Sequence, residues 1–258
     1  MTRRNNELVN ITNWLQANRL SLNTKKTHFV VFTTINKMYD PSLATINICN
    51  NHLVRETSTR FLGYFVDEHL TWKKHIEYVS LKIAKNIGVI NRLKYILPDD
   101  VLLSLYHTMI FPYLMYGNIV WASTYPTRLD KLFKLQKRIV RILSHSDYLA
   151  HTAPLFNNLK ILNIFNINIF QIACFVHKYL NKTLPHYFND FFSRNDEIHS
   201  YNTRKSRALH HFLNRTTLFK YALRQRGPVI WNTLSSEIKM LSDLYIFKTK
   251  LKTFLCSN

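Results

Sequence analysis

The sequence predicts an α+β protein that is predominantly α-helical, with a small β-rich region at the N-terminus followed by helices. Short runs of β-branched and aromatic residues lie within residues 1–70. From residue 72 onward, apolar residues recur at spacings of three and four over long stretches, which is typical of amphipathic helices. Apolar residues make up 47% of the 258 residues, enough for one large core or two modest ones.

The strongest compositional signal is the charge. The chain has 35 lysines and arginines against 15 aspartates and glutamates, which gives a net charge of +20. Such an excess opposes compact folding unless a polyanion offsets it, so nucleic acid is the preferred class of partner. An anionic membrane is the alternative, but the basic residues are spread along the chain and do not cluster beside one apolar helix. We therefore expect RNA and DNA as partners, and no membrane.

The cysteines and the apolar segments indicate the compartment. Cys49, Cys174 and Cys256 are widely separated, which argues against a disulfide framework and against a zinc finger. The first residues lack the apolar segment of a signal peptide, and the most apolar stretch, 161–180, is too polar for a membrane span. We expect a soluble intracellular protein of the cytoplasm or nucleus.

The N-terminal region is predicted to begin with an amphipathic helix at residues 7–20. A polar turn with the adjacent lysines Lys25 and Lys26 leads into a strand at residues 28–33. Residues 46–54 predict a short hairpin with an Asn-Asn turn, because asparagine tolerates a positive φ.

A further strand is predicted from Phe61, with bulky apolar residues up to Val66. Gly63 interrupts this run, as a glycine does where a strand kinks or another backbone approaches closely. We expect the side chains of Phe61 and Leu62 to lie in the core. Thr71 precedes a helical pattern and is placed to cap it.

Residues 72–97 predict the first long helix, because one face carries regularly spaced apolar residues: Ile76, Val79, Ile83, Ile87 and Ile90. Pro98 and the two aspartates after it are typical of a helix start. This second helix is expected to reach about residue 116, with a bend at Pro112. Gly117 ends it, and Trp121 is predicted to fall in the following loop.

Three further segments complete the helical region. Residues 128–143 predict an amphipathic helix with a basic polar face, and residues 154–184 contain more apolar-rich helix. Residues 185–200 are polar and aromatic, and we interpret them as a linker. The segment 247–255 predicts a basic amphipathic helix.

Basic residues follow the polar faces of these helices. One such face is usually only solvated, but several in succession on a strongly basic chain favour a groove for a phosphate backbone. Arg204, Lys205 and Arg207 form the densest local basic cluster, where contact with RNA and an ordinary protein surface are both compatible with the sequence. The helical candidates are Lys73, Lys74, Lys82, Lys85, Lys131, Lys134, Lys137, Arg138 and Arg141.

Four motifs at fixed spacing carry a resemblance to a known family. They are Phe-Leu-Gly-Tyr-Phe followed by Leu-Thr-Trp-Lys-Lys-His-Ile (61–76), Trp-Leu-x-x-Asn-x-Leu-x-Leu-Asn-x-x-Lys-Thr (14–27), Leu-Tyr-x-x-Met-Ile-Phe-Pro-Tyr-Leu-x-Tyr-Gly-x-x-Val-Trp (105–121) and Arg-Gly-Pro-x-x-Trp-Asn (226–232). Together they resemble the C-terminal part of the reverse transcriptases of LINE-like, non-LTR retrotransposons. The resemblance implies that residues 1–70 are the end of a polymerase palm with its primer grip. Residues 71–150 would be a helical thumb, and residues 151–258 a basic helical C-terminal region.

The resemblance also implies roles for two groups of residues in the N-terminal region. Lys26, with Lys25 beside it, would lie near the incoming nucleotide, where an ammonium offsets charge on the leaving pyrophosphate. Phe61, Leu62 and Gly63 would form the primer grip. A solvated loop and an ordinary strand-loop-helix unit are the alternatives.

The chemistry of a polymerase is missing from this stretch of sequence. A nucleotide polymerase needs paired carboxylates that hold two divalent ions. In the family that the chain resembles, two of them come from an aromatic-Ala-Asp-Asp hairpin that would precede residue 1. Asp99-Asp100 is interpreted as a helix start, and Asp67-Glu68 lies on the wrong element. We expect no catalytic and no metal-binding residue here, although the full-length enzyme would require Mg²⁺.

Two classes of function remain open. The first is a fragment of an RNA-directed DNA polymerase that is inactive alone but still binds a template–primer of RNA and DNA. The alternative is a module without enzymatic role, kept by a host genome, that binds nucleic acid or an acidic protein.

Overall fold

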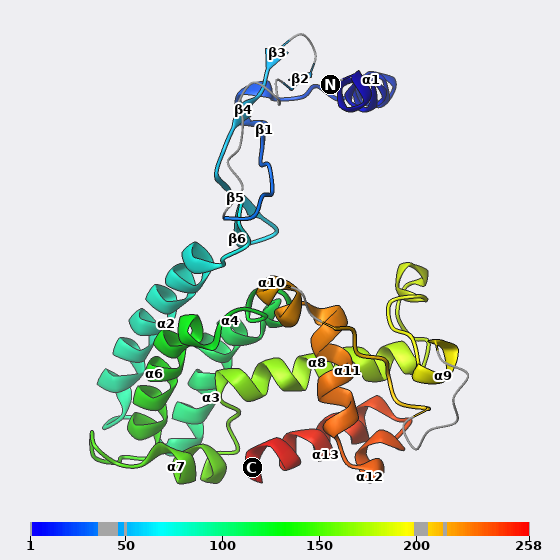
Figure 1. Ribbon diagram of the computed structural model, residues 1–258. Coiled ribbons are helices and arrows are strands. Elements are labelled where there is room, and N and C mark those ends of the chain that lie inside the picture. The colour runs from blue at the N-terminus through cyan, green and yellow to red at the C-terminus, as the bar shows by residue number, and fades with distance from the viewer. Residues whose placement is uncertain (1, 36–45, 49–50, 199–205, 214–215, 258) are drawn as a thin grey trace. The chain divides into compact units, whose positions relative to one another are not determined.

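The computed structural model describes residues 2–35, 46–48, 51–198, 206–213 and 216–257 (Figure 1). The chain divides into two compact units, residues 1–75 and residues 76–258. Most described residues are helical and the sheets are small, so the predicted predominantly helical α+β class is confirmed.

The first unit contains one long helix and three two-stranded sheets. Helix α1 spans Thr2–Ala17, and the short helix η1 spans Thr24–Lys26. The strands are β1 (His28–Phe29), β2 (Asn47–Ile48), β3 (Asn51–His52), β4 (Val54–Arg55), β5 (Ser58–Phe61) and β6 (Tyr64–Asp67). Strand β1 pairs with β4 in parallel, whereas β2–β3 and β5–β6 are antiparallel hairpins.

The strand and the hairpin predicted before residue 58 differ in part from the structure. The strand predicted at residues 28–33 is only two residues long, since β1 ends at Phe29. The hairpin predicted at residues 46–54 is present, with Ile48 paired to Asn51. Asn51 is therefore a strand residue and not a turn residue, and Asn50 of the predicted Asn-Asn turn lies outside the described residues.

The segment that begins at Phe61 is a hairpin turn and not a continuous strand. Phe61 pairs with Tyr64, so Leu62 and Gly63 form a two-residue turn between β5 and β6. Both have positive φ, 46° for Leu62 and 86° for Gly63. Turns of this kind match the twist of the strands and favour glycine at the second position. Gly63 is thus required by the turn, and the interpretation of a kinked strand was wrong.

The second unit is built from helices. Helix α2 (Lys73–Leu93) begins in the first unit and continues into this one. The helices that follow are α3 (Asp99–Met109), α4 (Phe111–Met115), α5 (Asn118–Trp121), α6 (Pro126–Leu143), α7 (Thr152–Asn158), α8 (Ile164–Leu180), α9 (Asn195–Ile198), α10 (Thr217–Tyr221), α11 (Leu223–Thr233), α12 (Ser236–Lys239) and α13 (Leu244–Ser257). The predicted apolar face of α2 is confirmed, since Ile76, Val79, Ile83, Ile87 and Ile90 are all buried.

The segment around Pro112 is broken into separate helices and is not one bent helix. Helix α3 ends at Met109, and α4 begins at Phe111 with the proline in its first turn, where the missing N–H costs no hydrogen bond. Gly117 adopts a left-handed φ of 54° and precedes α5. Trp121 was predicted to lie in a loop, but it ends α5 and is fully buried, with its Nε1–H donating to the Tyr116 carbonyl at 2.8 Å.

The apolar stretch predicted as helix from residue 154 is also interrupted. Helix α7 ends at Asn158, where Lys160 takes a left-handed φ of 51° and the Ile161 N–H donates back to the Phe156 carbonyl at 3.0 Å. A left-handed residue with such a return hydrogen bond is a common helix terminator. Asn163 then caps α8 by accepting a hydrogen bond from the Asn166 N–H at 2.9 Å.

Residues 185–198 are held to α8 through Phe192 although most of them are exposed, so the interpretation of this part as a linker was wrong. The short helix η3 (His186–Phe188) and α9 lie in it, and Phe192 is buried. The Tyr179 hydroxyl donates to the Asn189 carbonyl at 3.0 Å, and the Phe192 ring lies edge-on to the Tyr179 ring. The segment therefore covers the end of α8.

Helix α8 is the centre of the second unit. It contacts α4, α5, α6, α11 and α13, and α11 and α13 lie beside it in Figure 1. In the part of the chain that is described, no helix has both the length and the apolar character that a bilayer span requires.

Candidate nucleic-acid interface

A basic groove lies on the surface of the second unit between α2 and α6. Its volume is about 420 Å³. Four of its cations recur at spacings of three and four along α6 and therefore form one stripe on the helix: Lys131, Lys134, Arg138 and Arg141. The groove is lined by Ser80, Leu81 and Ala84 from α2, by Lys131, Lys134, Leu135, Lys137, Arg138 and Arg141 from α6, and by Tyr148.

The opposite face of α6 explains why the stripe points outward. Leu132, Ile139 and Val140 are fully buried, and the Gln136 side chain is buried with them. The Gln136 amide donates to the Leu162 carbonyl at 3.2 Å and its oxygen accepts from the Ile164 N–H at 2.7 Å. These bonds fix the rotation of α6 and leave Lys131 and Lys134 exposed, while Lys137 is half-buried with its ammonium over the Phe133 ring.

The groove carries positive charge without internal compensation. None of the residues that line it is acidic. Among the residues that the structure describes, the ion pairs involve histidine and arginine but no lysine. Like charges one helical turn apart destabilise a helix slightly, so an anion bound along this stripe would remove a repulsion.

Arg141 has a different surrounding from the lysines. Its Nε–H donates to the Ala150 carbonyl at 2.9 Å, and its guanidinium lies 6.0 Å from the centre of the Tyr148 ring. Arg141 therefore holds the loop between α6 and α7 at one end of the groove. We predicted it from sequence as a direct nucleic-acid contact, and the structure gives it this positioning contact in addition.

Other predicted basic residues lie outside the groove. Lys82 and Lys85 are exposed on α2 but do not line it, and the Lys82 ammonium lies 5.6 Å from the centre of the Tyr78 ring. Arg207 is exposed elsewhere in the second unit. Arg204 and Lys205 lie outside the described residues.

The candidates in the first unit lie at its surface. Lys25 and Lys26 are exposed in η1, whose first turn is capped by the Asn23 side chain, which accepts from the Lys26 N–H at 3.2 Å. Lys73 and Lys74 are exposed at the start of α2, and the Lys74 ammonium donates to the Ser58 hydroxyl at 2.6 Å.

Phe61 and Leu62 were expected in the core, and this was wrong. Their exposed fractions are 62% and 69%. A two-residue turn at the end of a two-stranded hairpin has no second layer to cover it, so its side chains project into solvent. The hairpin β5–β6 thus presents two apolar side chains at its tip, beside Arg60, whose guanidinium lies 5.9 Å from the centre of the Phe65 ring.

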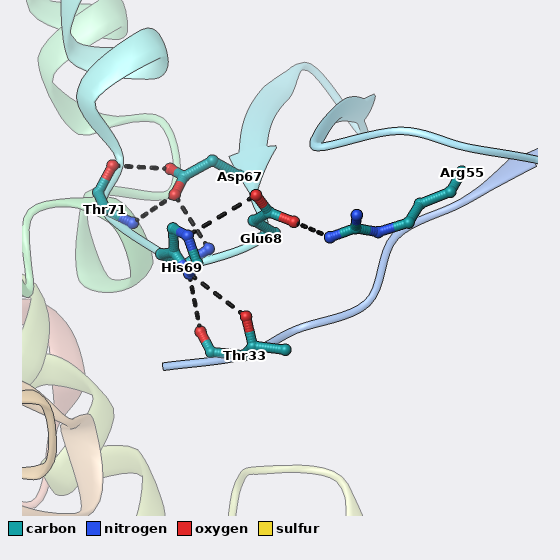
Figure 2. A network of polar contacts seen from close by, with 6 residues as sticks. All are labelled: Thr33, Arg55, Asp67, Glu68, His69 and Thr71. Atoms are coloured by element: carbon teal, nitrogen blue, oxygen red, sulfur yellow. Dashed lines mark hydrogen bonds and ion pairs between the residues drawn. The ribbon is translucent and has the colours of Figure 1, made fainter. Parts of the chain in front are cut away.

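A polar network that sequence reasoning missed joins this hairpin to α2 (Figure 2). The Asp67 carboxylate accepts hydrogen bonds from the Thr71 N–H at 2.9 Å, the Thr71 hydroxyl at 3.0 Å and the Trp72 N–H at 2.9 Å. It also accepts from the His69 N–H at 3.2 Å. Thr71, predicted to cap α2, lies two residues before the helix, and its hydroxyl accepts from the Lys73 N–H at 3.4 Å.

Glu68 belongs to the same network. Its carboxylate forms an ion pair with Arg55 and lies 3.7 Å from the His69 ring. The other ring nitrogen of His69 lies 3.0 Å from the Thr33 carbonyl oxygen. Both carboxylates are therefore engaged by neighbouring donors in a turn.

Comparison with protein-family models, with curated proteins and with solved structures found no match.

The remaining motifs lie in well-packed positions of the second unit. The Arg226 guanidinium donates to the side-chain oxygen of the buried Asn168, and Trp231 is buried. The Asn232 side chain accepts from the Leu209 N–H at 3.2 Å and donates to the Leu209 carbonyl at 2.9 Å. Within the described residues no group of three or more histidine, cysteine or acidic side chains is arranged to hold a metal ion.

Proposed function

We propose that this protein binds nucleic acid along the phosphate backbone through the basic groove between α2 and α6. The observation that carries the proposal is the stripe of Lys131, Lys134 and Arg138, which lies in a groove without an acidic lining residue on a chain of net charge +20. Neutralising phosphates with such a stripe releases condensed counterions, which is the main source of affinity in sequence-independent binding.

The resemblance to non-LTR reverse transcriptases supports a more specific form of the proposal. The ligand would be a template–primer of RNA and DNA, and the exposed tip of hairpin β5–β6 would meet the primer end. The two carboxylates at the end of strand β6, Asp67 and Glu68, support a role in binding and not in catalysis, because they are engaged by donors in the turn after the hairpin. We propose that this chain does not incorporate nucleotides by itself.

The test is the salt dependence of binding to a fluorescent RNA–DNA hybrid, measured by anisotropy. If four groove cations each neutralise one phosphate, the plot of log K against log salt concentration has a slope of about −4. In the double variant Lys134→Ala/Arg138→Ala, we expect this slope to become shallower by about 2.

The matched control removes the same charge elsewhere. Lys248 and Lys250 are exposed on α13, so Lys248→Ala/Lys250→Ala should leave the slope close to that of the unmodified protein. Equal losses in the two double variants, or binding that does not change with salt, would refute a role for the groove. Primer extension by the purified protein that EDTA abolishes would contradict the proposed lack of catalysis.

A further inference from the structure

We infer that Tyr148 is a stacking platform for an unpaired base, so the groove binds a single strand or the strand end of a template–primer more tightly than a uniform duplex. The inference rests on the proposed function, since it specifies the ligand of the same groove. Tyr148 lines the groove and is 83% exposed.

The loop that carries Tyr148 is held at both ends. The Arg141 side chain binds the Ala150 carbonyl at 2.9 Å, and the His145 ring nitrogen lies 2.9 Å from an Asp99 carboxylate oxygen on α3. Inside the loop, the Ser146 N–H donates to the Arg141 carbonyl at 3.0 Å and the Ala150 N–H to the Asp147 carbonyl at 3.1 Å. An exposed ring on such a braced loop loses little freedom when a ligand covers it, which lowers the entropic cost of binding.

The surroundings of the ring match a nucleotide in both charge and polarity. The Arg141 guanidinium lies 6.0 Å from the centre of the Tyr148 ring and places a positive charge next to it. The ring is still highly exposed, so a base can stack on it. Leu81 and Leu135 provide an apolar part of the groove, and Lys134 and Arg138 lie along it for the phosphates. Proteins that bind single strands combine these two elements, a basic track and an aromatic side chain on which a base stacks.

The experiment compares two ligands and three variants of the full chain. The ligands are a single-stranded oligonucleotide with 2-aminopurine at one position, scanned along the strand, and a blunt duplex of the same sequence. Tyr148→Ala should weaken binding of the single strand about tenfold and remove the quenching of 2-aminopurine. Tyr148→Phe should preserve both, and Tyr148→Ala should leave duplex affinity unchanged.

Leu149 provides the matched control, because it is the next residue and is 85% exposed. Leu149→Ala should behave as the unmodified protein with both ligands. Equal weakening of single strand and duplex by Tyr148→Ala, or no weakening of either, would overturn the stacking role. If Lys134→Ala/Arg138→Ala also leaves the affinity for both ligands unchanged, the proposed function fails as well. If this double variant weakens binding but Tyr148→Ala does not, only the stacking role is rejected.

Discussion

Asp67 connects a strand to a helix through one side chain. The turn after it contains two residues with left-handed backbone, Leu70 with φ of 51° and Trp72 with φ of 62°. Such conformations cost roughly 1 kcal/mol or more each for residues other than glycine, so neighbouring contacts must hold them. The four hydrogen bonds that the Asp67 carboxylate accepts supply this support.

We predict that Asp67→Ala destabilises the first unit by about 2 kcal/mol, because several amides in the turn lose their acceptor. Amide hydrogen exchange of residues 67–75 measures this directly. Glu77→Ala, at an exposed position of α2, is the control and should leave exchange in these residues unaltered. Unchanged protection in Asp67→Ala would show that water replaces the carboxylate at no cost.

His75 is a second residue whose environment has a measurable consequence. It is 3% exposed, and its ring lies 5.4 Å from the Tyr64 ring and 6.5 Å from the Trp72 ring. Burial disfavours the charged imidazolium and lowers the pKa of His75 to about 4. The unfolded chain, with a pKa near 6.5, binds this proton more readily than the folded protein does.

We therefore predict that the stability of the first unit falls as the pH drops from about 6.5 toward 4, because the folded protein does not bind this proton. The loss attributable to this proton is about 3 kcal/mol. In His75→Phe, which keeps an aromatic ring but cannot titrate, protection factors of residues 58–72 should fall less over this range. The exposed His211 serves as control: if His211→Phe has the same effect, the pH dependence does not come from His75.

At the scale of elements, two glycines in helices have opposite surroundings. A Cβ at Gly227 in α11 would lie 2.5 Å and 2.7 Å from two atoms of the Phe192 ring. A Cβ at Gly88 in α2 would meet no atom within 4 Å. Gly227 thus permits the close approach of α11 to Phe192, in the segment 185–198 that covers the end of α8. Gly88 has no such contact and only weakens α2.

We predict that Gly227→Ala destabilises the protein by about 2 kcal/mol, because overpacking outweighs the gain in helix propensity. Gly88→Ala should stabilise it by about 0.5–1 kcal/mol. Thermal unfolding of the two variants measures both, and each is the control for the other. A shift in the same direction for both would mean that Phe192 moves aside and that only propensity matters.

Periodicity predicted the long helices well because their cores follow from spacing alone, as in the buried stripe of α2. It failed where the backbone changes direction. Lys160 adopts a left-handed φ although it is not a glycine, so the break before α8 had no glycine to signal it. At the hairpin tip Gly63 was the signal, but the left-handed φ of Leu62 before it was not expected. The basic stripe of α6 was predictable, but the place of Tyr148 beside it depends on a loop held by Arg141.

At the scale of the whole molecule, the net charge of +20 bears on stability as well as on binding. Repulsion among the cations opposes the folded state, and salt screens it over a Debye length of about 10 Å at 0.1 M. A polyanion that binds the folded protein stabilises it further by mass action.

We predict that raising NaCl from 20 to 300 mM increases Tm by about 3 °C, and that heparin at low salt increases it by more. Differential scanning fluorimetry measures both, with an equal osmolarity of sorbitol as control. A Tm that falls with salt would show that attractive pairs, such as Arg55–Glu68, outweigh the repulsion.

The central position of α8 also has a consequence for how the chain is made. Its Asn166 amide donates to the Leu255 carbonyl at 2.8 Å, and its His177 ring stacks on Phe247 at 4.3 Å. On the ribosome, Asn166 emerges 89 residues before Leu255, and His177 emerges about seventy residues before Phe247. Until α13 has been synthesised, the apolar surface of α8 that α13 covers stays exposed on the nascent chain. We expect a chaperone to be needed during this interval.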